Sequence, residues 1–499
     1  MKKYQKNLMS VILAIACAVS MTACSANMAP TSAMPGGSGY LEGNLSGESY
    51  TEIVENDFVS AAENNTSYFS IDANTASYPN LRSLINNQYS IPKDAVRVEE
   101  MLNYFRYDYA APTDGSVLSL TASVFDNPYN NETKLLTIGL AAQQIEFTEV
   151  KNNLVFLIDT SGSMFGADRL DLVKSAFMML AENLNPEDRV SIVTYAGSSS
   201  VALDGAFGYE KQKIMAVIED LEAGGSTAGA DGINSAYRLA EKYFIEGGNN
   251  RVILATDGDF NVGVSSVDGL EKLISQKRDS GVYFSVFGVG RGNLQNNRME
   301  ALALKGNGTC SYIDSKNEAR RALVEQIGGT MVTVAKDVKA GITFNTDYVE
   351  SFRLIGYENK LLTQEEFENS ETDAGELGSG HTITVVYEIK LTEKALEAGE
   401  NLAQVILKYK PTENVGGDAT EQELTMDVST AAYHAQPTQT DAFVAAVVEF
   451  ALLLRDSQFK ADANFTALAD RLQALDLSGD EFKEEFRQLV MTYMDQKKD

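Results

Sequence analysis

The chain has 499 residues, with 41 Lys and Arg against 70 Asp and Glu, and it carries a formal net charge of −29. This charge argues against a nucleic-acid binder and against electrostatic docking on anionic lipid, because both need a basic surface. Two His and three Cys leave little room for a multi-His metal site or a disulfide framework. The hydrophobic fraction of 44% is ordinary for a globular protein, and the length predicts about two to four domains.

Residues 1–23 have the order of an export signal. Basic residues precede an apolar run over 8–19, which is too short to span a bilayer permanently. The small residues before Cys24 resemble a bacterial lipobox, with Met21 where Leu is usual. This resemblance implies lipidation of Cys24 and an exported protein that is lipid-anchored to the cell membrane or outer membrane, facing outward. An ordinary signal peptide cut elsewhere is the alternative.

Residues 24–66 have the composition of a linker. They are rich in Ser, Gly, Ala, Asn and Pro, and they include Pro-Gly-Gly-Ser-Gly at 35–39. Few apolar residues recur with a regular period, so we predict a flexible stalk. About 40 such residues have a root-mean-square span of roughly 35 Å, which would hold the folded part away from a membrane.

The central part of the chain alternates apolar strand-like runs with amphipathic helical patterns. This alternation predicts an α/β fold, a doubly wound and mostly parallel sheet with helices on both faces. The expected strands are 153–158, 189–195, 251–256, 282–289 and 309–313, with 198–203 returning as one antiparallel edge strand. The expected helices are 169–184, 233–244, 270–277, 294–304 and 317–332. Ligands of such sheets bind at the carboxyl ends of the strands.

Three loops at that edge carry oxygen-bearing side chains. The first strand runs into Asp159-Thr160-Ser161-Gly162-Ser163, a second loop reads Gly-Gly-Ser-Thr-Ala-Gly at 224–229, and a later strand ends at Asp-Gly-Asp over 257–259. Oxygen ligands suit a hard divalent cation such as Mg²⁺, Mn²⁺ or Ca²⁺. Asp-x-Ser-x-Ser within one turn directs three side-chain oxygens toward one point, and the glycine between the serines permits the tight bend.

Asp159, Ser161 and Ser163, followed by Thr227 and Asp257 in the later loops, resemble the metal-ion-dependent adhesion site of von Willebrand factor type A domains. The resemblance implies that the three hydroxyls coordinate a divalent cation, Mg²⁺ first and Mn²⁺ or Ca²⁺ otherwise. It implies that the two aspartates bind directly or through water. It also implies an open coordination position, which a carboxylate of a partner protein fills. A site that persists only as a relic of the fold is the alternative.

The flanks of the central region, 152–333, resemble those of a group of bacterial lipoproteins with a von Willebrand factor type A domain. The N-terminal likeness rests on Asp-Ala-Asn-Thr-Ala-Ser-Tyr at 72–78. Asn74 replaces an Asp of the group's motif, which weakens the case for a second metal site there. We predict instead that Thr75 or Ser77 caps the helix that follows.

Alternating apolar patterns predict strands on both sides of the central region, in 115–151 and in 334–432. The segments 353–359 and 373–381 resemble the same group's C-terminal region. Because the strands of 115–151 are too few to bury a face alone, we expect both flanks to build one β-sandwich-like domain. The type A domain would then be an insertion in that domain.

Both ends of the folded part are expected to be helical. Residues 67–114 predict an N-terminal helical region, and 433–499 predict two or three C-terminal helices. The apolar stretch 443–454 is too short for a membrane span, so we expect it to pack on the sandwich.

The sequence carries no recognisable enzyme signature. Gly-x-Ser-x-Gly, His-Glu-x-x-His and Cys-x-x-Cys are all missing. We expect structural roles for His381 and His434 and a buried apolar role for Cys310. The favoured function is a non-enzymatic, lipid-anchored surface protein that binds an unknown partner's Asp or Glu through the metal. An envelope assembly or structural factor, in which the metal is mainly stabilising, is the alternative.

Overall fold

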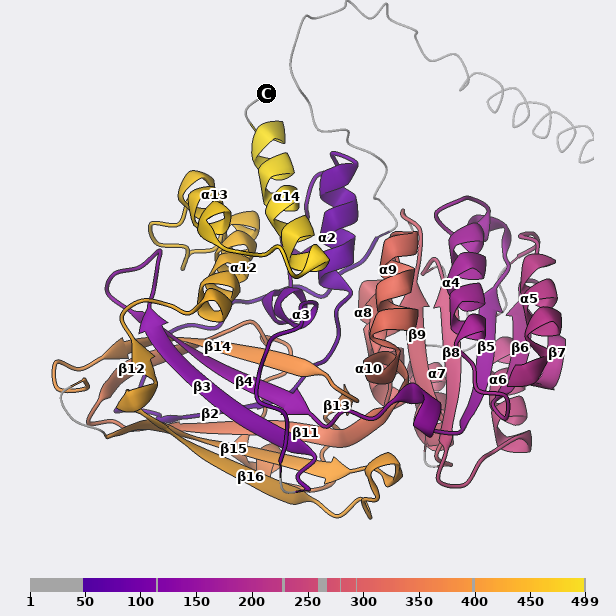
Figure 1. The fold of residues 1–499 in the computed structure, drawn as a ribbon, viewed down its shortest axis with the longest axis horizontal. Helices are drawn as coiled ribbons and strands as arrows, with labels where there is room; N and C mark the ends of the chain where they lie inside the picture. The colour runs from indigo at the N-terminus through magenta and orange to yellow at the C-terminus, as the bar shows by residue number, and fades with distance from the viewer. Residues whose placement is uncertain are drawn as a thin grey trace, which may run out of the picture. The chain divides into compact units, whose positions relative to one another are not determined.

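The computed structural model describes residues 48–497 except 114, 227–228, 259–266, 279, 293 and 397–399 (Figure 1). The predicted export signal, Cys24 and the predicted stalk before residue 48 lie outside these residues. So does Thr227, one of the five expected metal ligands. Three β-sheets organise the described part of the chain.

The central sheet is mostly parallel. Its order is β10-β9-β8-β5-β6-β7, and of these strands β7 alone runs antiparallel to its neighbour. The strands are β5 (Asn152–Asp159), β6 (Arg189–Tyr195), β7 (Ser199–Phe207), β8 (Asn249–Thr256), β9 (Tyr283–Gly288) and β10 (Cys310–Tyr312). Strands β5 and β8 are buried at every position, as apolar strands between two helical layers must be. The predicted α/β fold class is confirmed.

Helices cover both faces of this sheet (Figure 1). Apolar side chains of α4 and α5 share one core with the strands, and those of α6, α7 and α8 share a second core on the opposite face. The bounds are α4 (Leu170–Glu182), α5 (Lys211–Glu219), α6 (Gly229–Lys242), α7 (Val267–Arg278) and α8 (Asn296–Lys305). The sequence pattern did not predict α5.

The segment predicted as one helix over 317–332 is broken. It consists of α9 (Lys316–Arg320), a π-helical turn (Arg321–Glu325) and α10 (Ile327–Met331). The interruption lies at the π-helical turn and at Gln326, whose φ of −114° and ψ of 25° are not helical. A Cβ on Gly329 would lie 2.6 Å from the His381 ring, so the position requires glycine. The prediction of a continuous helix is therefore wrong.

Two further sheets enclose a shared apolar core and form a β-sandwich. One has the order β1-β12-β14-β4-β3-β17, and the other has the order β13-β11-β15-β16 with β2 also paired to β11. Both sheets combine strands that precede and follow the central domain. The strands are β1 (Val59–Ser60), β2 (Thr66–Ser70), β3 (Leu118–Asp126), β4 (Lys134–Ala142), β11 (Thr333–Phe344), β12 (Val349–Ile355), β13 (Gly375–Gly378), β14 (Thr382–Leu391), β15 (Asn401–Pro411), β16 (Gln422–Ser429) and β17 (Tyr433–His434).

The last part of the predicted stalk is folded. Strand β1 pairs antiparallel with β12, and the start of β2 pairs with β11. Upstream, Ser49 N donates to Leu294 O at 2.9 Å, and Asn56 Nδ2 donates to Leu354 O at 3.1 Å. The stalk prediction is therefore wrong for 48–66. These short polar stretches have no apolar period of their own. Pairing with distant strands stabilises them instead, so their own sequence did not predict them as strands.

A layer of helices covers the outer face of the sheet that contains β3, β4 and β14 (Figure 1). Its helices come from both ends of the folded part: α2 (Ser77–Asn86), α3 (Val98–Asn103), α12 (Gln439–Arg455), α13 (Phe465–Ala474) and α14 (Glu481–Gln496). Their apolar side chains share a core with Phe125, Leu135 and Val386 of the sheet. The short helix α11 (Gln364–Glu368) lies outside this layer's core. None of the helices in the described part of the chain is long and apolar enough to cross a membrane.

The Asp-Ala-Asn-Thr-Ala-Ser-Tyr motif joins the N-terminal segment to the central domain. Helix α2 has Ala76 at its N-cap and no side-chain cap, so the prediction that Thr75 or Ser77 caps it is wrong. The Ser77 hydroxyl instead donates to a backbone carbonyl before α3 at 2.7 Å. Asn74 Oδ1 accepts from Cys310 N at 2.9 Å, which fixes the motif to strand β10.

Candidate metal site

The first predicted ligand loop follows strand β5 directly. Asp159 ends the strand, and a 3-10 turn (Gly162–Met164) follows, with Met164 fully buried in the core. Ser161 N donates to Asp159 Oδ1 at 2.9 Å, and the Ser161 and Ser163 hydroxyl oxygens lie 3.0 Å apart. The loop therefore gathers one carboxylate and two hydroxyls at the carboxyl edge of the sheet.

The Asp159 carboxylate is buried and held in place by its neighbours. Its Oδ2 accepts hydrogen bonds from Tyr195 OH and Thr256 Oγ1, each at 3.1 Å. Burial, together with the nearby Asp257 carboxylate, raises the pKa of Asp159 to about 6. Two desolvated carboxylates in one place are costly unless a positive charge compensates them. This edge of the sheet therefore favours a cation.

Arg169 is a site residue that no sequence pattern indicated. Its Nη1 lies 3.7 Å from Asp257 Oδ2 and donates to Ser163 O, while Nη2 donates to Arg291 O at 2.5 Å. The guanidinium thus ties the first ligand loop to the end of β8 and partly compensates the buried aspartates. Its place at the start of an amphipathic helical pattern gave no local signal of this role.

The second predicted loop lies against the first. Gly162 N donates to Gly225 O at 3.1 Å, and Gly224 N donates to Thr160 O at 2.8 Å. These backbone bonds bring the segment before Thr227 beside the two serines, although Thr227 itself lies outside the described residues.

The hydrogen-bonded Ser161 and Ser163 hydroxyl oxygens have a separation that fits a small divalent cation. Ligands about 2.1 Å from an octahedral Mg²⁺ are about 3.0 Å apart at adjacent corners, and the Ser161 and Ser163 hydroxyl oxygens have this separation. Within the described ranges, no three His, Cys, Asp or Glu side chains gather in a metal-binding cluster. A site of this kind has two aspartates and takes its other ligands from hydroxyls, so it does not need such a cluster.

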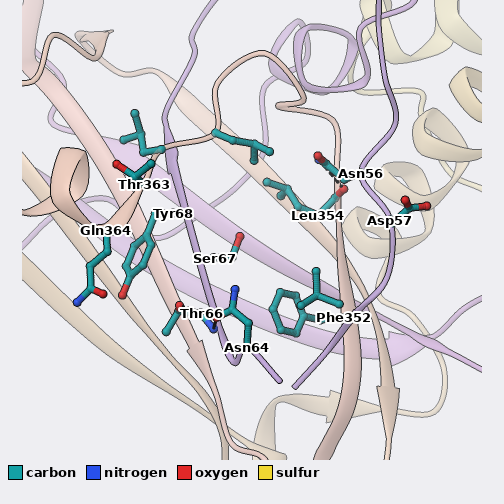
Figure 2. A pocket seen from close by; sticks show the side chains of 13 residues that line it. Asn56, Asp57, Asn64, Thr66, Ser67, Tyr68, Phe352, Leu354, Thr363 and Gln364 are labelled. Atoms are coloured by element: carbon teal, nitrogen blue, oxygen red, sulfur yellow. Dashed lines mark hydrogen bonds between the residues drawn. The ribbon is translucent and has the colours of Figure 1, made fainter. Parts of the chain in front are cut away.

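A pocket of about 570 Å³ lies in the β-sandwich and shares no residue with the candidate metal site (Figure 2). Asp57 is the one charged side chain among its lining residues, so the lining offers no acid–base pair for catalysis. The other lining residues are amides, hydroxyls and apolar groups: Asn56, Val59, Asn64, Thr66, Ser67, Tyr68, Phe352, Leu354, Leu361, Leu362, Thr363 and Gln364.

Two side chains with catalytic chemistry have structural roles. Burial lowers the pKa of His381 to about 4, and its Nδ1 accepts from Gly378 N at 3.1 Å. Cys310 is fully buried, and burial raises the pKa of its thiol. The predicted burial of Cys310 is confirmed.

A buried ion-pair network joins the central domain to the helical layer. Arg82 of α2 donates to both Asp314 oxygens, at 2.6 and 2.9 Å, and to Glu318 Oε2 of α9 at 2.8 Å. It also donates to Glu485 Oε1 of α14 at 2.7 Å. A second guanidinium, Arg321, donates to Glu318 Oε1 at 2.6 Å. Arg82 and Asp314 are 232 residues apart in the sequence, so no local pattern could reveal the network.

The fold and the site together define a doubly wound α/β domain with an Asp-x-Ser-x-Ser loop at the carboxyl edge of a central strand. Residues 153–326 match the family model of the von Willebrand factor type A domain. Residues 44–137 match a model described as von Willebrand factor, and 329–495 match the C-terminal region of the uncharacterized protein YfbK. The chain therefore belongs to the proteins built around a von Willebrand factor type A domain.

Several known proteins are similar to this chain. The uncharacterized protein YfbK of Escherichia coli (strain K12) is 39% identical over 383 residues, which are 75% of this chain and 66% of that protein. Inter-alpha-trypsin inhibitor heavy chain H3 of Homo sapiens is 27% identical over 273 residues, which are 50% of this chain and 30% of that protein. A solved von Willebrand factor type A structure from Catenulispora acidiphila has a TM-score of 0.41 and 16% identity, and the match covers 69% of this chain and 80% of that one.

Proposed function

We propose that the type A domain binds a partner protein through a divalent cation held by Asp159, Ser161, Ser163, Thr227 and Asp257. The observation that carries the proposal is the meeting of the Ser161 and Ser163 hydroxyls, 3.0 Å apart, beside the buried Asp159 carboxylate. Mg²⁺ is the first candidate, and Mn²⁺ and Ca²⁺ are the others. When bound, the cation supplies a Lewis-acid contact for an anionic oxygen.

The balance of charged and neutral ligands supports a carboxylate as the natural partner group. The two proposed aspartates at most balance the charge of a divalent cation, and the other three proposed ligands are neutral hydroxyls, so the ion can still accept one further anionic oxygen. An Asp or Glu of the partner supplies such an anion in a form that protein surfaces commonly present. Because the contact passes through the ion, binding should be lost when a chelator removes the metal.

The hydroxyl beside Asp159 helps to position this proposed ligand. Burial, together with the Asp159 carboxylate, raises the pKa of Tyr195 well above its usual range. Its hydroxyl donates to Asp159 Oδ2 at 3.1 Å and so holds that carboxylate in place.

We also propose that the protein is exported and anchored by lipid on Cys24, facing outward from the cell membrane or outer membrane. The support is the basic, apolar and small-residue order of residues 1–24. Labelling of expressing cells with an alkyne fatty acid should modify the wild-type chain and not the Cys24→Ser variant. Equal labelling of the two would contradict the anchor.

A calorimetric titration with Mg²⁺, Mn²⁺ and Ca²⁺ tests the metal site. We expect saturable binding of one ion, lost in the Ser161→Ala/Ser163→Ala double variant and in Asp159→Asn. At 100 times its dissociation constant, the ion should stabilise the native state by about 2.7 kcal/mol. Thermal unfolding with and without metal measures that stabilisation independently.

Asp188→Asn is the matched control, since Asp188 is also fully buried but accepts backbone hydrogen bonds from Asn152 and Asn185 at the amino end of the central strands. This variant should lose stability and keep the metal affinity of the wild type. Metal binding that survives in the double serine variant would refute the assignment of the ligands.

An envelope assembly or structural role, in which metal mainly stabilises the fold, is the second candidate. The buried Arg82 network favours it, because the network bonds the type A domain to the flanking helices. Metal-independent association with a partner would support this role over metal-dependent capture.

A further inference from the structure

The loop that carries Ser161 and Ser163 ends in a highly exposed aromatic ring. Phe165 is 82% exposed, the highest value among the exposed large apolar side chains of the described residues, while Met164 beside it is fully buried. A single exposed apolar side chain is common on protein surfaces, so exposure alone indicates no partner. The position of Phe165, two residues after a proposed metal ligand, is what sets it apart.

The loop holds Phe165 in a defined place. Met164 anchors the loop in the core, and Phe165 N donates to Gly162 O at 3.4 Å. Arg169 Nη1 donates to Ser163 O and so braces the same turn from the other side. A braced backbone loses little conformational freedom when a partner covers it, and an aromatic side chain has only two rotatable bonds left to order. Phe165 therefore has the properties of a pre-organised contact.

The facing loop carries no bulky side chain over residues 224–226. Gly224, Gly225 and Ser226 are exposed and small, and a Cβ on Gly224 would meet no atom within 4 Å. No bulky side chain of these three residues blocks the approach to the serine hydroxyls. A partner can therefore bring a carboxylate to the proposed cation and lay a neighbouring side chain on Phe165.

On the basis of the proposed metal-dependent function, we propose that Phe165 is a second recognition element of the site. The partner then presents an apolar side chain within two residues of its Asp or Glu. Two residues of chain span at most about 7 Å, so the Cα atoms of Ser163 and Phe165 lie no farther apart than those of alternate residues in an extended segment. The matching pattern in a partner is an acidic residue followed by Leu, Ile or Phe two positions on.

The negative net charge of the chain gives a physical reason for an apolar contact at this site. A net charge of −29 opposes the approach of an acidic partner at long range. Burial of apolar surface is insensitive to that repulsion, because it depends on the area removed from water. The Phe165 ring thus adds to the affinity for a partner. It also favours carboxylates that have an apolar side chain nearby over the other carboxylates that the cation alone would bind.

Fluorescence anisotropy with labelled ten-residue peptides tests this proposal at saturating Mg²⁺. The peptides share a Gly-Ser frame and carry Asp with Phe two positions later, Asp with Ser in that place, or Asn with Phe. The full chain is compared with Phe165→Ala and with Tyr209→Ala. Tyr209 is 66% exposed and follows β7 at the opposite edge of the sheet, so it is a matched control for loss of an exposed aromatic ring.

The wild type and Tyr209→Ala should bind the Asp–Phe peptide about 30-fold more tightly than the Asp–Ser peptide, the factor of a typical hot-spot residue. Phe165→Ala should bind the two alike and keep the wild-type Mg²⁺ affinity. Equal binding of both peptides by the metal-loaded wild type, or no binding of either, would overturn the proposal, as would a preference that survives in Phe165→Ala. Failure of the proposed function looks different: Mg²⁺ does not bind, or the Asn peptide binds as well as the Asp peptide.

Discussion

Replacement of Arg82 by alanine tests how the type A domain is joined to the helical layer. In the wild type, Arg82 makes two hydrogen bonds to Asp314, which is 7% exposed, and further bonds to Glu318 and Glu485. A buried charge left without its partner costs about 3–5 kcal/mol. Glu318 retains Arg321, and Glu485 is 32% exposed and can be hydrated. The loss therefore falls mainly on Asp314, and we expect about 3 kcal/mol of destabilisation.

Urea unfolding followed by circular dichroism measures this cost. The double variant Arg82→Ala/Asp314→Ala should be more stable than Arg82→Ala alone, because it removes the uncompensated carboxylate. Lys390→Ala breaks an exposed ion pair with Glu350 and should change stability little. The reasoning is refuted if Arg82→Ala is no less stable than Lys390→Ala. It is also refuted if the double variant is less stable than Arg82→Ala.

Three further substitutions have definite expected outcomes. Burial raises the pKa of Glu99 from 4.5 to about 7, so the folded state holds this proton more tightly than the unfolded state and loses up to about 3 kcal/mol of stability as the pH rises from 4.5 through 7. The difference in the free energy of unfolding in urea between Glu99→Gln and the wild type should grow over that range. Parallel pH profiles of the two proteins would disprove this prediction. Thr438→Ala removes the capping box of α12 and should lower the free energy of unfolding by about 1 kcal/mol. An unchanged free energy of unfolding in urea would show that the cap contributes nothing. Gly378→Ala places a Cβ 1.8 Å from a backbone oxygen, whereas Gly479→Ala meets nothing within 4 Å; the first should lower the thermal midpoint sharply and the second should not, and similar midpoints would contradict the packing.

Most of the central domain could be predicted from the sequence because its strands are continuous apolar runs. The run predicted at 251–256 corresponds to β8 (Asn249–Thr256), and the predicted edge strand at 198–203 corresponds to β7 (Ser199–Phe207). Burial on both faces of a parallel sheet demands such runs, so each strand is encoded locally. The Asp-x-Ser-x-Ser loop was found for a related reason, since its residues are adjacent in the sequence.

The remaining features depend on contacts between distant segments. Strand β2 reads Thr-Ser-Tyr-Phe-Ser, and pairing with β11 gives it a structure that its own pattern does not predict. The helix predicted after β10 is interrupted by a π-helical turn and by Gln326. Arg169 and Arg82 were missed as well, because the partners of each come from other elements. Long-range pairing of this kind leaves no periodic trace in a single sequence.

Anomalous diffraction from crystals grown with Mn²⁺ tests the central claim most directly, because it locates the bound ion. The account predicts one strong peak within coordination distance of the Ser161 and Ser163 hydroxyls, about 2.1 Å away if the ion sits as Mg²⁺ does. The same peak should be missing from crystals of the Ser161→Ala/Ser163→Ala variant. A peak at another place, or a wild-type crystal with no peak at these serines, would contradict a metal-dependent binding site in this domain.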